Sequence, residues 1–133
     1  MSDLCERLQD VQEAGVYRLS CPVEVLRGNV LLSGLRSFEI DLASVHSKGE
    51  FLAAVAHAIQ APDWFGHNFD ALADALCDLS WLGDADKGYV LLLQNGDQTL
   101  GLTAADHAIV TDIFNDAVSC WKTDGKPFWV FLA

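Results

Sequence analysis

The sequence predicts an α/β fold in which a small parallel β-sheet is covered by helices and all 133 residues form one domain. Short apolar runs that are typical of strands alternate along the chain with longer segments of helical periodicity. Strands separated by helices favour parallel pairing through right-handed crossovers. The chain is 51% hydrophobic and 20% charged, as is ordinary for a globular protein, and its length suits a single core.

The N-terminal third of the chain is predicted to contribute two helices and two strands. Pro22 suits the first turn of a helix, although Gly28 weakens that helix. Apolar residues alternate with acidic ones from Phe38, as in a strand with one buried face. In order, we expect a helix over residues 2–13 with Leu4, Leu8 and Val11 on one side and Gly15 closing it, an extended segment over 16–19, a helix from Pro22 to about Leu32, and a strand over 38–42.

The remainder is predicted to contain three helices and two strands. Ser47 and Thr103 are plausible N-caps, and Pro62 ends the first of these helices. The uninterrupted apolar run YVLLL suits a central strand buried on both faces. In order, we expect a helix from Ser47, a helix from about Phe69 to Leu79, a loop over 83–88, a strand over 89–93, a helix of roughly eighteen residues from Thr103 with Ile109, Val110, Ile113, Phe114, Ala117 and Trp121 facing inward, and the strand FWVFL.

The net charge of −11 limits the classes of partner. Neutralising nucleic-acid phosphates needs clustered Lys and Arg, and the chain has eight of them in all, so direct nucleic-acid binding is disfavoured. The acidic balance favours a basic protein partner, or serves solubility alone. The N-terminus lacks the pattern of a secretory signal and no apolar run approaches a membrane span, so we expect a cytoplasmic protein that does not contact a membrane.

The four cysteines are expected to be reduced thiols. They are scattered along the chain, without a CxxC pair and without a nearby histidine at a metal-ligand spacing. The sequence therefore predicts neither a zinc site nor a disulfide framework, and it suggests no cofactor.

The stretch PDWFGHNFDALADAL places three aspartates on one helical face. Asp70, Asp74 and Asp78 fall opposite the apolar arc of the predicted helix. Like charges four residues apart cost a few tenths of a kcal/mol per pair, and a broken local rule is expected at functional sites. Asp112 and Asp116 form a second row on the later helix, so a concentrated negative patch results if the two helices are neighbours. A solvated acidic face without a partner is the alternative.

The loop WFGHN precedes the first acidic row. Gly66 is expected to supply a backbone angle that other residues resist, and Asn68 is a natural cap for the helix that follows. We expect Phe65 to lie in the core. For Trp64, burial and partner contact both remain open, because Trp is favoured at interaction hot spots.

The run PDWFGHNFDALADAL resembles the signature of the barstar family, intracellular protein inhibitors of secreted bacterial ribonucleases. A proline, an aromatic pair, a glycine, an asparagine and a DAL-x-D core recur in that signature at this spacing. The late helix LTAADHAIVTDIFNDAVSCW and the terminal FWVFLA also fit the family's end. The resemblance covers residues 38–133 and implies a barstar-like fold. Residues 1–37 form an N-terminal extension, which we interpret as an added strand and crossover helix on the same sheet.

The resemblance also implies an inhibitory surface that occludes the active site of a nuclease. Asp74 takes the position of the family's principal anchor, whose carboxylate enters the phosphate-binding site of the nuclease. Asp70 and Asp116 match two further interface acids. Carboxylates in a cationic active site satisfy its arginines without offering a scissile bond, so the protein would mimic a substrate.

The loop before the helix is implied to belong to the same surface. Trp64 stands where the family's archetype has an aromatic residue that packs on the catalytic histidine of the nuclease. Two positions depart from the archetype, which has a tryptophan in place of Ala73 and an acid in place of His67. These two residues are therefore expected to decide which nuclease is bound. Further contact positions are Gly66, Asn68 and Phe69.

Two other functions compete with ribonuclease inhibition. An enzyme could use Asp70, Asp74, Asp116 and His67 as metal ligands or acid-base groups, but the chain has no recognisable ligand motif, phosphate loop or GxSxG. A binding module of the same fold could instead carry its acidic patch to another basic protein, since a fold does not fix a partner. We expect a cytoplasmic inhibitor in a one-to-one complex, with no catalytic role, metal or cofactor.

Overall fold

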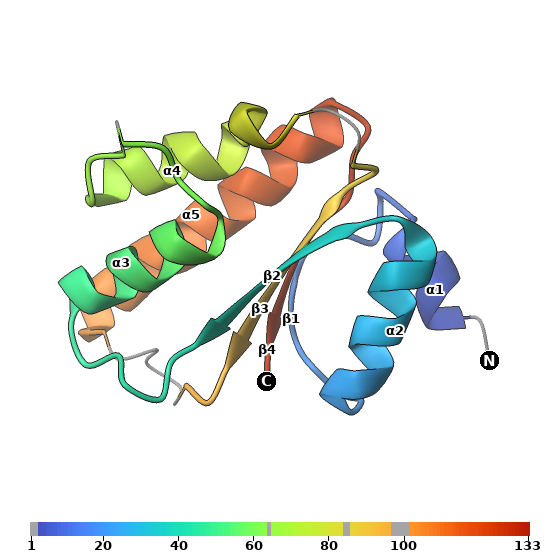
Figure 1. The fold of residues 1–133 in the computed structure, drawn as a ribbon, viewed down its shortest axis with the longest axis horizontal. Helices are drawn as coiled ribbons and strands as arrows, with labels where there is room; N and C mark the ends of the chain where they lie inside the picture. The colour runs from blue at the N-terminus through green and yellow to red at the C-terminus, as the bar shows by residue number, and fades with distance from the viewer. Residues whose placement is uncertain (1–2, 64, 84–85, 97–101) are drawn as a thin grey trace.

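A computed structural model describes residues 3–63, 65–83, 86–96 and 102–133 (Figure 1). It confirms the predicted α/β class, because four parallel strands form one sheet with helices on both faces. The elements are α1 (Asp3–Leu8), β1 (Val16–Arg18), α2 (Val23–Ser33), β2 (Arg36–Asp41), α3 (Lys48–Ala58), α4 (Phe69–Asp78), the short 3-10 helix η1 (Ser80–Leu82), β3 (Tyr89–Gln94), α5 (Ala104–Thr123) and β4 (Phe128–Leu132).

The strands lie in the order β1-β4-β3-β2, so β3 and β4 are central. Figure 1 shows α1 and α2 on one face of the sheet and α3, α4 and α5 on the other. Residues 89–93 of β3 are all buried, as predicted for YVLLL. A strand covered on both faces needs apolar side chains on both sides, which explains its lack of alternation.

The N-terminal segment extends the sheet, as predicted. Tyr17 of β1 stands opposite Phe131 of β4 in parallel register, and α2 then crosses back over the sheet. The indole N–H of Trp129 in β4 donates a 2.9 Å hydrogen bond to the carbonyl of Leu8. This bond ties α1 to the buried strand.

Three local predictions need correction. The first helix ends at Leu8 because the Asp10 carboxylate accepts a 2.9 Å hydrogen bond from the backbone N–H of Gln12, which favours a turn over further helix. Gly15 therefore does not close this helix. Ile109 is 42% exposed, whereas the other predicted inward residues of α5 are buried. It lies at the edge of the apolar stripe of α5, next to the exposed face of the helix.

Helix α4 packs side by side with α5 (Figure 1), and α5 in turn packs on β4. Leu72, Ala75 and Leu76 of α4 are completely buried. The buried stripe of α5 includes Phe114 and Trp121, and the ring centre of Trp121 lies 4.9 Å from that of Tyr89 in β3. The hydrophobic faces of the two helices thus meet, and their polar faces turn outward together.

An ion pair between α2 and β2 gives the fold a predicted pH dependence. Arg27 donates to Glu39 with contacts of 2.6 to 3.2 Å, and this hydrogen bond is the main reason why the pKa of Glu39 lies below its ordinary value of 4.5. A lowered pKa in the folded state means that the ionised carboxylate stabilises the fold above pH 4.5. That stabilisation is lost as the pH falls through the lowered pKa.

We therefore expect Arg27→Ala to decrease the free energy of unfolding slightly at pH 7, because the pair is partly exposed. The difference from the unsubstituted protein should shrink as the pH is lowered from 4.5. Urea denaturation at several pH values measures this, with Arg27→Lys as a control that keeps the charge. A difference of equal size at neutral and acidic pH would contradict the assignment.

Candidate functional site

Five exposed aspartates form what we call the acidic surface: Asp70, Asp74 and Asp78 of α4, with Asp112 and Asp116 of α5. Within the described residues, none of the five forms an ion pair. Asp78 accepts a 3.0 Å hydrogen bond from the Ser80 hydroxyl. Because no Lys or Arg of the described residues pairs with these carboxylates, the acidic surface keeps its negative charge.

Local chemistry fixes the start and the orientation of α4. The side-chain oxygen of Asn68 accepts a 2.8 Å hydrogen bond from the backbone N–H of Ala71, which confirms the predicted N-cap. Asp70 lies in the first turn, where the helix dipole favours a carboxylate. The apolar arc is buried against α5, so the acidic row of α4 can only face outward.

A surface hollow of about 620 Å³ lies between α4 and α5. It brings together three of the predicted site residues, Ala73, Asp74 and Asp116, from segments far apart in the sequence. Asp70 is exposed on α4 and does not line the hollow. The complete lining is Ala73, Asp74, Cys77, Asp116, Ser119, Cys120 and Thr123.

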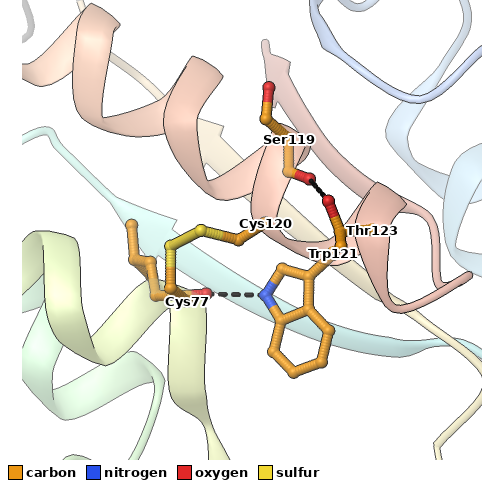
Figure 2. The surroundings of a disulfide bond; sticks show 6 residues. Cys77, Ser119, Cys120, Trp121 and Thr123 are labelled. Atoms are coloured by element: carbon orange, nitrogen blue, oxygen red, sulfur yellow. Dashed lines mark hydrogen bonds between the residues drawn. A yellow bond between two sulfur atoms is a disulfide. The ribbon is translucent and has the colours of Figure 1, made fainter.

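A disulfide joins Cys77 of α4 to Cys120 of α5 (Figure 2). Both cysteines line the hollow. The expectation of four reduced thiols is therefore wrong for this pair, while Cys5 and Cys21 are free. The two cysteines are 43 residues apart and come together only because α4 packs on α5. Beside the disulfide, the indole N–H of Trp121 donates a 2.7 Å hydrogen bond to the carbonyl of Leu76.

The loop before α4 holds its unusual backbone angle at His67, where φ is +49°. The prediction for Gly66 is wrong, because Gly66 is not among the residues with positive φ. A Cβ at Gly66 would lie 3.0 Å from the side-chain nitrogen Nδ2 of Asn68, so glycine leaves room for the capping side chain. Phe65 is buried, as predicted, and the His67 ring meets its ring edge-on at 5.1 Å. Trp64 lies outside the described residues.

Phe69 is half-buried at the first position of α4. The ammonium group of Lys48 from α3 lies 4.2 Å from the centre of its ring, within the range of a cation–π contact. His67 and Asp63 line a second hollow, of about 340 Å³, together with His57 of α3. The start of α4 and the loop before it therefore lie beside α3.

Several residues of this region were not predicted from the sequence. Ser119, Cys120 and Thr123 follow Asp116 at helical spacings of three, four and seven residues, so they share its face of α5. That spacing was a usable signal. The contacts of Lys48 and Cys77 depend on how separate helices pack, and no local pattern indicates them.

The described residues contain no cluster of three His, Cys, Asp or Glu side chains that could hold a metal ion. None of the helices within residues 3–63, 65–83, 86–96 and 102–133 is both long and apolar enough to cross a membrane.

Comparison with known proteins gives one family. The model of the family described as Barstar (barnase inhibitor) matches residues 35–133. The match begins at residue 35, slightly before the expected start at residue 38, and it includes β2, α3, α4, β3, α5 and β4. No curated protein matches the chain. The matched region contains both helices of the acidic surface.

Proposed function

The chain belongs to the barstar family, and from that membership we propose that it is a protein inhibitor that binds a bacterial ribonuclease and blocks its active site. The observation that carries the proposal is the joint position of Asp74 and Asp116 beside one hollow, without a cation from the described residues to pair with them. A ribonuclease active site must bind phosphate with cationic groups. Such a site would supply the charges that this surface lacks.

The proposed contact surface has Asp74 at its centre. Its carboxylate enters the phosphate-binding site of the nuclease, while Asp70 and Asp116 pair with basic groups on either side. Ala73 and His67 set the choice of nuclease, because one shapes the hollow and the other the loop beside it. The other proposed contacts are Trp64, Gly66, Asn68 and Phe69.

The inhibitor acts by occlusion and has no catalytic role in this proposal. Residues 1–133 act as one domain, in which residues 1–37 extend the sheet away from the contact surface. We place the one-to-one complex in the cytoplasm, where an inhibitor would protect a cell from its own ribonuclease. No cofactor takes part.

The direct test is a titration of barnase, the enzyme that the family's description names. Ribonuclease activity should fall in proportion to added inhibitor and reach its minimum at one equivalent. Metal titration of the inhibitor alone runs in parallel. If barnase and other basic bacterial ribonucleases keep full activity while the protein takes up a metal specifically, the inhibitor proposal is wrong. Tight capture of a basic protein without ribonuclease activity would favour a general binding module.

The net charge of −11 gives a second prediction. A negative field accelerates encounter with a basic enzyme, and salt screens that field beyond roughly 10 Å at 0.1 M ionic strength. The association rate with barnase should therefore fall steeply with added salt, while the dissociation rate changes less. Stopped-flow mixing at several ionic strengths measures both rates. An association rate that is independent of salt would rule out steering.

A further inference from the structure

The disulfide joins the two helices that carry the acidic surface. Asp74 precedes Cys77 by three residues and Asp116 precedes Cys120 by four, so each carboxylate lies one helical turn from a bonded cysteine. All four residues line the same hollow of about 620 Å³. A change in the bond therefore occurs within one helical turn of each of the two proposed anchoring acids.

The bond opposes a repulsion that the surface itself creates. Asp74 and Asp116 carry like charges at the edge of one hollow, and no described cation pairs with either of them. Their repulsion favours a wider separation of α4 and α5 on this side. The disulfide holds the Cα atoms of its cysteines 5.7 Å apart, whereas two free thiols must move to van der Waals separation.

The contact between α4 and α5 does not depend on the disulfide alone. Leu72, Ala75 and Leu76 are buried where α4 packs on α5, and the hydrogen bond from Trp121 to the Leu76 carbonyl does not involve sulfur. This buried contact lies on the side of α4 away from solvent. Loss of the disulfide is therefore expected to loosen the hollow without separating the helices.

The disulfide is open to a reductant. Cys120 is exposed and Cys77 is half-buried, and both line the solvent-facing hollow. A dithiol attacks one sulfur through its thiolate, which breaks the Cys77–Cys120 bond and forms a mixed disulfide. Its second thiol then releases the cysteine. Two electrons and two protons end on the cysteines, and the dithiol becomes a disulfide.

We propose that Cys77–Cys120 is a reducible clamp that presets the spacing of Asp74 and Asp116, so that the oxidised protein binds its partner more tightly than the reduced one. Its effect on inhibition rests on the proposed function. Its effect on the spacing of Asp74 and Asp116 concerns the free protein and does not depend on a partner. Rigid presentation of two charges lowers the cost of ordering them in a complex. Disulfides in a reducing cytoplasm are usually transient or redox-sensing, which fits a reversible clamp.

The test compares the oxidised protein, the dithiol-reduced protein and the double variant C77S/C120S. Alkylation and mass spectrometry count the free thiols of the folded protein. The inhibition constant for barnase should rise at least about fivefold on reduction, a typical size for coupling between two states. The double variant should match the reduced protein. The matched control, C5S/C21S, changes the two free cysteines and should keep both the oxidised affinity and the response to dithiol.

Carboxyl resonances in NMR spectra give a readout without a partner. Those of Asp74 and Asp116 should shift on reduction, while that of Asp41, at the end of β2, should not. Equal inhibition by both forms overturns the clamp, as do unmoved Asp74 and Asp116 resonances or a bond that dithiol cannot reduce in the folded state. If barnase is inhibited by neither form, the proposed function fails for that enzyme. The two resonances then decide the clamp by themselves.

Discussion

Asp74→Ala is expected to abolish inhibition at concentrations where the unsubstituted protein acts stoichiometrically. Its carboxylate is exposed beside the hollow between α4 and α5, and the proposed complex would bury it among cationic groups of the nuclease. Removing one partner of a buried charge pair costs about 3–5 kcal/mol, which corresponds to a loss of affinity of roughly a hundredfold to several thousandfold. Titration of barnase activity with the variant measures the loss.

The free energy of unfolding of Asp74→Ala should rise slightly or stay unchanged. Asp74 lies between Asp70 and Asp78 on one face of α4, and removing it relieves two repulsive pairs of a few tenths of a kcal/mol each. Asp78→Ala is the matched control, because Asp78 is an exposed acid of the same row that does not line the hollow. If both variants weaken inhibition equally, the acids act through net charge and Asp74 is not an anchor.

The second large effect concerns the stability of the fold. The Cys77–Cys120 bond closes a loop with a sequence separation of 43 residues. In the chain-entropy account, such a loop contributes about 4 kcal/mol by restricting the unfolded chain. Reduction, or the variant C77S/C120S, should therefore lower the melting temperature by roughly 10–15 °C.

Calorimetry or circular dichroism of the oxidised and reduced forms measures this change, with C5S/C21S as the control. That control should melt within a few degrees of the unsubstituted protein, since both of its cysteines are free. Identical melting of the oxidised and reduced forms would show that the bond adds nothing to the fold. The stability result does not depend on any partner.

Much of the fold follows from patterns within short stretches of sequence. The caps Ser47, Asn68 and Thr103 each accept a hydrogen bond from a backbone N–H three residues later, as their residue types predict. The uninterrupted apolar run of β3 indicated a strand buried on both faces. The first helix was predicted too long because the turn formed by Asp10 competes locally with helical hydrogen bonds.

For the candidate site, too, local patterns predict some features and helix packing reveals the others. The helical wheel placed Asp70 and Asp74 on the polar face of α4, and Asp116 on that of α5. The common hollow of Asp74 and Asp116, and the contact of Lys48 with the Phe69 ring, required the helices to be placed in space. The roles of these residues in binding stay predictions.

The class of the fold, the helix starts, the buried central strand and the outward face of each acidic row can all be derived from the sequence. Periodicity and capping depend on residues within one or two turns of each other, so they can be read along the chain. The pairing of Cys77 with Cys120, and the hollow that Asp74 and Asp116 share, become visible only in the folded structure. Contacts across 43 residues depend on how α4 packs on α5, and no local spacing encodes that packing.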